Sequence, residues 1–79
     1  MKVYLVTPSN GDPRVFLELE NAQKFLNYIK TDMHVHMGWI DSEGRHREIL
    51  QNEDYTTFAS LTEVKVYDAP NTNDSTTAG

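Results

Sequence analysis

The sequence predicts a small α+β fold, a mostly antiparallel sheet in the order β-β-α-β-β-(α)-β with one helix packed on one face. Three observations lead to this fold class. Several segments alternate apolar and polar residues with the period of two typical of β-strands. One segment between them carries apolar residues at helical spacing. Two turn-rich segments, 8–13 and 41–44, separate strands that read as hairpins.

The first hairpin is expected within residues 2–20, on either side of the turn-rich stretch PSNGDP. Both flanking segments alternate, and pairing Leu5 with Leu17 aligns their apolar residues. That register gathers one apolar set on a single face, which we expect to be the core face. The set consists of Val3, Leu5, Leu17 and Leu19.

The period changes at Asn21, a residue that is favoured as a helix N-cap. A helix is therefore predicted over 21–31. Its apolar side chains fall at spacings of three, four and seven, so they form one stripe that we expect to lie on the sheet. The stripe consists of Ala22, Phe25, Leu26 and Ile29.

A second hairpin is predicted around the stretch DSEG at 41–44, which fits a type I turn followed by a left-handed glycine. This turn places Trp39 opposite Arg47 and Met37 opposite Ile49. One face of the hairpin then holds a second apolar set, which we also assign to the core. It consists of Val35, Met37, Trp39 and Ile49.

The segment 51–61 is predicted as a short helix capped by Asn52, with an irregular loop as the alternative. A strand over 63–68 follows, with Val64 and Val66 directed inward. We expect a single α+β domain over 1–70. Residues 71–79 contain no large apolar side chain, so we expect a disordered C-terminal tail.

Composition excludes several classes of protein. The absence of cysteine removes disulfides, zinc ribbons and thiol nucleophiles. The first residues are too weakly apolar for a signal peptide or a membrane span, so we expect a cytoplasmic protein that contacts no membrane. A formal net charge of −5 disfavours direct binding of nucleic acid, whose phosphates are contacted by Lys and Arg. A protein with a basic surface is the better electrostatic match.

The histidines suggest a metal site as an alternative function. His34 and His36 are two apart on one strand, and Glu48 is diagonal to His36 in the predicted register. Two imidazoles and a carboxylate form a donor set that zinc or non-haem iron uses. His46 is left out because it lies two cross-strand rows from His36. A pH switch is a further alternative, because histidine titrates near pH ~6.5 and three histidines of one hairpin could be protonated together. The simpler interpretation of both patterns is a set of solvent-exposed histidines with little effect on folding.

An enzyme is not expected. The serines lie in predicted turns or at a helix end, outside any nucleophile elbow. The SNGDP stretch lacks the glycines of a phosphate-binding loop. We therefore expect no catalytic residues and no cofactor.

The function that remains is protein binding through the sheet face that the predicted core leaves open. By analogy of size and charge, this composition suits a phage or mobile-element inhibitor, of the anti-CRISPR or DNA-mimic type, that occludes a basic surface of a host nucleic-acid-binding protein. A structural homodimer is the further alternative. The predicted binding residues are Tyr4, Phe16, Glu18, Glu20, Ile40, Glu48, Leu50, Glu63, Tyr67 and Asp68.

Overall fold

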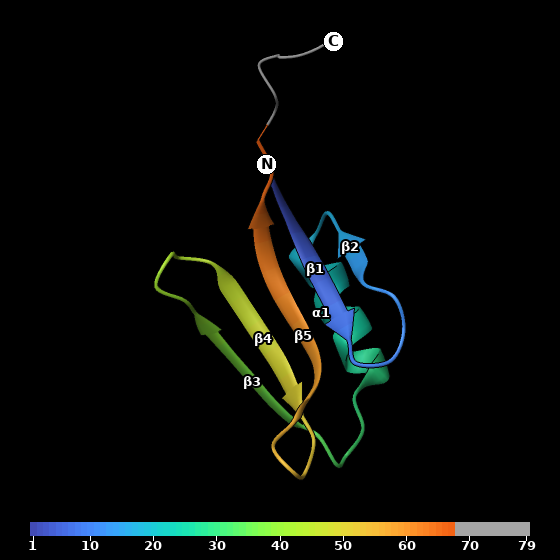
Figure 1. Ribbon diagram of the computed structural model, residues 1–79. Helices are drawn as coiled ribbons and strands as arrows, with labels where there is room; N and C mark the ends of the chain where they lie inside the picture. Colours follow the sequence, from blue (N-terminus) through green and yellow to red (C-terminus); the bar gives the residue numbers. More distant parts are fainter. Residues whose placement is uncertain (68–79) are drawn as a thin grey trace.

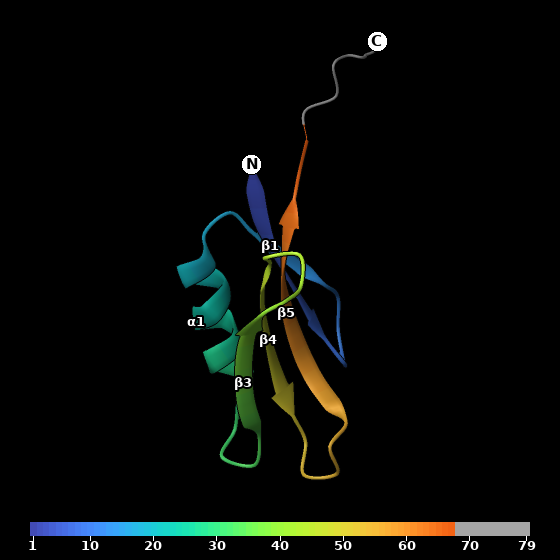
Figure 2. The same ribbon diagram turned by 90° about the vertical axis from the view of Figure 1, so that its left-hand side faces the viewer.

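The computed structural model describes residues 1–67, so Asp68 and the predicted tail lie outside the described residues. Its elements are β1 (Lys2–Pro8), β2 (Arg14–Phe16), α1 (Leu19–Ile29), β3 (Val35–Ile40), β4 (His46–Gln51) and β5 (Thr57–Lys65). The five strands form one antiparallel sheet in the order β2-β1-β5-β4-β3 (Figure 1). The helix α1 lies on one side of this sheet (Figure 2). The predicted α+β fold class is therefore confirmed.

The β3–β4 hairpin has the register that the sequence predicts, with Trp39 opposite Arg47 and Met37 opposite Ile49. Its turn places Gly44 at φ 79°, in the left-handed region that favours glycine. The Gly44 N–H donates to the carbonyl oxygen of Asp41 at 3.0 Å. The carboxylate of Asp41 also accepts hydrogen bonds from backbone N–H groups inside the turn, at Glu43 and Arg45. Local turn chemistry is sufficient to set this register.

The first hairpin differs from the prediction. Leu5 pairs with Val15 rather than with Leu17, and β2 has only three residues. The chain leaves the sheet after Phe16, and α1 begins at Leu19, two residues before the predicted start. Glu18 occupies the N-cap position without a side-chain capping bond.

The largest difference lies in β5. Residues 57–61, predicted as part of a short helix, belong to a nine-residue strand that pairs with β1 and with β4. The preceding turn is closed by a hydrogen bond from the Asn52 N–H to the Thr56 carbonyl oxygen at 2.8 Å. Tyr55 adopts a left-handed conformation in this turn, with φ 69°. The strand β5 is therefore the centre of the sheet.

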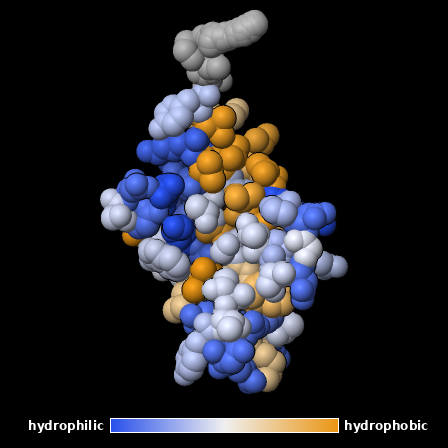
Figure 3. Space-filling view, in the orientation of Figure 1, coloured by the Kyte–Doolittle hydropathy of each residue, from blue (hydrophilic) through white to orange (hydrophobic). Residues whose placement is uncertain are grey.

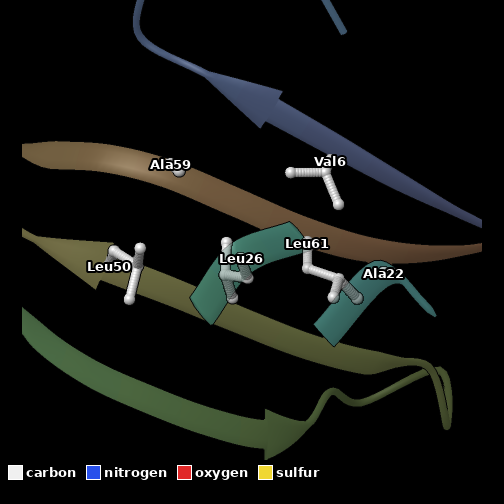
Figure 4. Close-up of a cluster of buried hydrophobic side chains, with 6 residues drawn as sticks. All are labelled: Val6, Ala22, Leu26, Leu50, Ala59 and Leu61. Atoms are coloured by element: carbon white, nitrogen blue, oxygen red, sulfur yellow. The ribbon is translucent and has the colours of Figure 1, made fainter. Parts of the chain in front are cut away.

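This central strand decides which face is the core. Leu61 and Ala59 of β5 point toward α1, between Val6 of β1 and Leu50 of β4. The predicted stripe of α1 packs on them, with Leu26 fully buried (Figure 4). The complete buried apolar cluster consists of Val6, Ala22, Leu26, Leu50, Ala59 and Leu61.

The core face predicted from the two hairpins is therefore wrong. Strand residues alternate between faces, and the strand residues assigned to the core have the opposite parity to Val6 and Leu50, as has Val64, which was predicted to point inward. They line the side of the sheet that α1 does not cover. Leu17 follows β2 outside the sheet, and Leu19 begins α1 and packs against the core. The prediction that the α1 stripe packs on the sheet is confirmed, but it packs on the other side.

Within residues 1–67, the helix is too short to cross a membrane.

Candidate functional site

One face of the sheet is covered by no helix of residues 1–67, and we call it the helix-free face. Figure 3 views the molecule from this side and shows an apolar patch over β1, β2 and the end of β5. The strand registers assign to this face the side chains of Val3, Leu5, Thr7, Val15, Val35, Met37, Trp39, Arg47, Ile49, Gln51, Ser60, Thr62 and Val64.

The helix-free face is apolar and almost uncharged. Val15 is 63% exposed, Val35 is 55% exposed and Trp39 is 43% exposed. Arg47 is the one Lys, Arg, Asp or Glu that the strand registers place on it within the described residues, and its Nε lies 3.4 Å from Oδ2 of Asp41. The apolar patch over β1, β2 and the end of β5 is separated from the apolar side chains of β3 by Arg47 and polar residues of β5. Scattered apolar residues are normal on protein surfaces, but a patch of neighbouring apolar side chains indicates an interaction site.

The residues predicted to bind a protein do not form one accessible surface. Leu50, Glu48 and Glu63 are buried on the side of the sheet that faces α1. Tyr4 and Phe16 lie on that side too and pack against the core.

The other predicted binding residues are separated in the fold. Glu18 and Glu20 are exposed at the start of α1, Ile40 is exposed at the end of β3, and Tyr67 is exposed after β5. Asp68 lies outside the described residues. Glu18 and Glu20 are separated from the sheet because the chain leaves it after β2, whereas the burial of the first group follows from the inverted assignment of the two sheet faces.

On the α1 side of the β3–β4 hairpin, Glu48 forms the centre of a polar cluster. Its side chain accepts hydrogen bonds from Nε2 of His36 at 2.6 Å, from Nε2 of His46 at 2.5 Å and from Nε2 of Gln23 at 2.7 Å. Gly38 lies opposite Glu48 in the sheet. A Cβ at Gly38 would lie 3.4 Å from Cγ of Glu48, so the glycine leaves room for the buried carboxylate.

The environment of Glu48 stabilises its ionised form. The residue is only 4% exposed, and this burial raises the pKa of its carboxyl. Hydrogen bonds from Gln23, His46 and His36 outweigh the burial and hold the pKa of Glu48 below its usual range. Because a carboxylate only accepts hydrogen bonds, each histidine Nε2 must carry the donated proton. The cluster links α1, β3 and β4.

Glu63 is the second buried carboxylate on this side of the sheet. It accepts a hydrogen bond from the His46 N–H at 3.2 Å, and Nζ of Lys2 lies 3.5 Å from its other oxygen. The hydrogen bond from the His46 N–H and the charge of Lys2 outweigh the effect of burial and hold the pKa of Glu63 below its usual range. The second oxygen, Oε2, is buried without a hydrogen-bond donor among the described residues and is compensated by the charge of Lys2 alone.

The predicted metal site is not assembled. The ring of His34 stacks on Phe58 with centroids 4.1 Å apart, and its Nδ1 accepts a hydrogen bond from the Thr31 N–H at 3.0 Å. Within residues 1–67, no three His, Asp or Glu side chains are grouped so that they could hold a metal ion. The predicted trio is wrong because His34 precedes β3 and is held by its own loop and by Phe58.

His46 is the residue that the sequence interpretation left out. It lies on the same strand and the same face as Glu48, two residues away. The spacing His-x-Glu within a strand was the available signal, because side chains two apart share a face. The distance between His46 and His36 does not matter for this cluster, because each histidine binds a different oxygen of the Glu48 carboxylate.

Two depressions in the surface of the described residues are lined by side chains other than those of His36, His46 and Glu48. The exposed apolar side chains of the helix-free face make that face the candidate functional site.

Comparison of the chain with protein-family models, with curated proteins and with solved structures finds no match.

Proposed function

We propose that this chain is a non-enzymatic protein-binding module that binds its partner through the helix-free face. The observation that carries the proposal is the set of exposed apolar side chains on that face, with Val15 at one edge of the sheet and Val35 and Trp39 at the other. Burying apolar surface contributes about 25 cal/mol per Å². A partner that covers the apolar side chains of this face therefore gains free energy from their burial.

The dimensions of the helix-free face suit such a role. Strands about 4.8 Å apart and residues about 3.3 Å apart give a footprint of roughly 500 Å² for a five-stranded sheet of this length. Side-chain relief increases the accessible area beyond this flat value. Specific protein interfaces bury roughly 600–1,000 Å² on each partner, so the whole face is of the size that one partner covers.

The charge distribution favours a partner with an apolar surface. The carboxylates predicted to meet a basic partner are either buried, as Glu48 and Glu63 are, or lie at the start of α1, as Glu18 and Glu20 do. Within the described residues, the strand registers place no carboxylate on the helix-free face, so a basic surface would find no charge partner there. A module of this kind acts by covering a surface of its partner, which is also the mechanism expected of an inhibitor.

The proposal is tested with purified protein as bait in a lysate of its native cells, at low and at high salt. Val15→Lys places a charge on the helix-free face, and Tyr28→Lys is the matched control because Tyr28 is 84% exposed on α1. We expect a partner that the unchanged chain and Tyr28→Lys retain at both salt concentrations and that Val15→Lys loses.

Two results contradict the proposal. Retention by Val15→Lys equal to that of the unchanged chain would exclude the helix-free face. Release at high salt, together with loss of binding when Glu18 and Glu20 become Lys, would instead support electrostatic occlusion of a basic surface.

A further inference from the structure

Within residues 1–67, the strand β3 is an edge of the sheet and its own sequence carries none of the usual features that block pairing. All six of its residues, Val35–Ile40, are exposed. Half of the backbone N–H and C=O groups of an edge strand point away from the sheet and lack a strand partner. Natural edge strands are commonly protected by Lys, Pro or a bulge. The sequence of β3, VHMGWI, contains no Lys, Asp, Glu, Arg or Pro, and its pairing with β4 is regular.

The opposite edge of the sheet differs in each of these respects. The strand β2 has three residues, is preceded by Pro13 and begins with the charged Arg14. The guanidinium of Arg14 lies over the ring of Phe25, 4.9 Å from its centroid. A short charged strand is a poor template for a further strand, whereas β3 has six residues and contains no Lys, Arg, Asp or Glu.

We propose that β3 pairs with β3 of a second copy of this chain, antiparallel, about a twofold axis at Met37. A twofold axis perpendicular to the sheet places the same face of both copies on the same side, so side chains that share a face in one copy also share it across the dimer. Met37 then lies opposite Met37 of the partner subunit. Trp39 lies opposite the partner subunit's Val35, and His36 opposite the partner's Gly38. The two sheets join edge to edge.

A second copy fits this edge better than a charged partner does. The chain has a net charge of −5, so most contacts between two copies bring carboxylates together. At β3 no carboxylate is present, and the pairing aligns apolar side chains across the axis, each pair contributing to the stability of the sheet. The uncharged edge offers a basic or acidic partner nothing complementary.

This inference goes beyond the proposed function, because it uses the backbone edge and leaves the helix-free face open in both copies. The buried area of a single strand pair is at the small end of specific interfaces, so we expect a reversible dimer with a dissociation constant in roughly the micromolar range. The helix-free faces of both copies would then form one wider apolar surface on the same side.

The pairing is tested by single-cysteine variants, because the natural sequence contains no cysteine. Residues directly opposite each other on neighbouring strands are close enough for a disulfide. Under mild oxidation we expect Met37→Cys to form a covalent dimer. We expect Trp39→Cys and Val35→Cys to cross-link when they are mixed and not when each is alone. Val15→Cys, on β2, is the control that stays monomeric.

A second measurement follows the dimer without covalent bonds. Sedimentation equilibrium should show a dimer for the unchanged chain and for Tyr28→Lys, and Met37→Lys should weaken it by roughly tenfold or more, since it places like charges opposite each other. Met37→Lys should retain the circular dichroism spectrum of the unchanged chain, because Met37 is exposed.

Either of two outcomes overturns the inference. The first is an unchanged chain that stays monomeric up to the highest soluble concentration. The second is a dimer that cross-links through Val15→Cys and not through Met37→Cys, which would place the contact on the helix-free face. A monomer that still retains its partner in the lysate experiment would leave the proposed function intact.

Discussion

Replacing Glu48 by Ala tests whether the buried carboxylate holds the helix and the β3–β4 hairpin together. The substitution removes the acceptor of three hydrogen bonds, from Gln23, His36 and His46. A hydrogen bond to a charged group contributes about 1.5–3 kcal/mol when it is buried. The side chains of His36 and His46 are 29% and 25% exposed. Water can therefore accept hydrogen bonds from them in the variant and recover part of the lost free energy.

Discounting the histidine bonds for this exposure, we expect Glu48→Ala to lower the free energy of unfolding by roughly 2–3 kcal/mol. This is a large fraction of the roughly 5 kcal/mol expected at the low end for small domains. With a urea dependence of about 1 kcal/mol per M for a chain of this size, the unfolding midpoint should fall by roughly 2 M.

The assay is urea unfolding followed by circular dichroism and by the emission of Trp39, the only tryptophan. Glu20→Ala is the control, because Glu20 is exposed and its only ion pair is with Lys24 at 3.6 Å. We expect no measurable change for this control. If Glu48→Ala also changes the free energy of unfolding by less than about 0.5 kcal/mol, the cluster does not stabilise the fold and the reasoning is refuted.

Three further changes test the fold. Leu26→Ala should lower the free energy of unfolding by about 2–5 kcal/mol, because Leu26 is fully buried; Tyr28→Ala, on the exposed side of α1, should leave the urea midpoint unchanged. The pKa values of Glu48 and Glu63 are lowered in the fold from an ordinary 4.5. The contribution of these two carboxylates to the free energy of unfolding is therefore complete above pH 4.5 and is lost as the pH decreases further. Thermal melts should show a melting temperature that decreases when the pH is lowered below ~4.5. A melting temperature that increases in this range would contradict the assignment. Gly44→Ala should cost about 1 kcal/mol in urea unfolding because of its left-handed conformation, and equal stability would show that the turn rearranges.

The parts of the fold that local chemistry determines were predictable from the sequence. The register of the β3–β4 hairpin follows from the DSEG turn, which requires a left-handed residue at Gly44. The buried stripe of α1 follows from spacing alone, since Ala22 and Leu26 lie on one side of any helix that contains them. Neither inference needs knowledge of the rest of the chain.

The core face was not predictable in the same way. In β1 both faces are apolar, with Val3 and Leu5 on one side and Tyr4 and Val6 on the other, so local alternation does not show which side the helix covers. The decision comes from β5, whose Leu61 pairs with both Val6 and Glu48. The prediction placed this strand at 63–68 and assigned residues 57–61 to a helix because of the helix-like start at 52–54. Without Ala59 and Leu61 in the sheet, the core was assigned to the wrong face.

The candidate site follows the same division. His36 and Glu48 were placed together from the sequence because they are diagonal neighbours in a hairpin of predictable register. Gln23 was not expected to join them, because the contact depends on which side of the sheet α1 occupies. His34 was wrongly included because its ring is held by Phe58, a residue on a strand that was predicted as a helix.

The most direct test of the central claim is photo-cross-linking in the native cells of this protein. A photo-reactive phenylalanine analogue is placed at Thr62, which lies between Leu5 and Arg47 on the helix-free face, or at Tyr28 on α1 as the control. We expect a covalent adduct with another protein from position 62 and none from position 28. The absence of an adduct from position 62, or equal adducts from both positions, would contradict binding through the helix-free face.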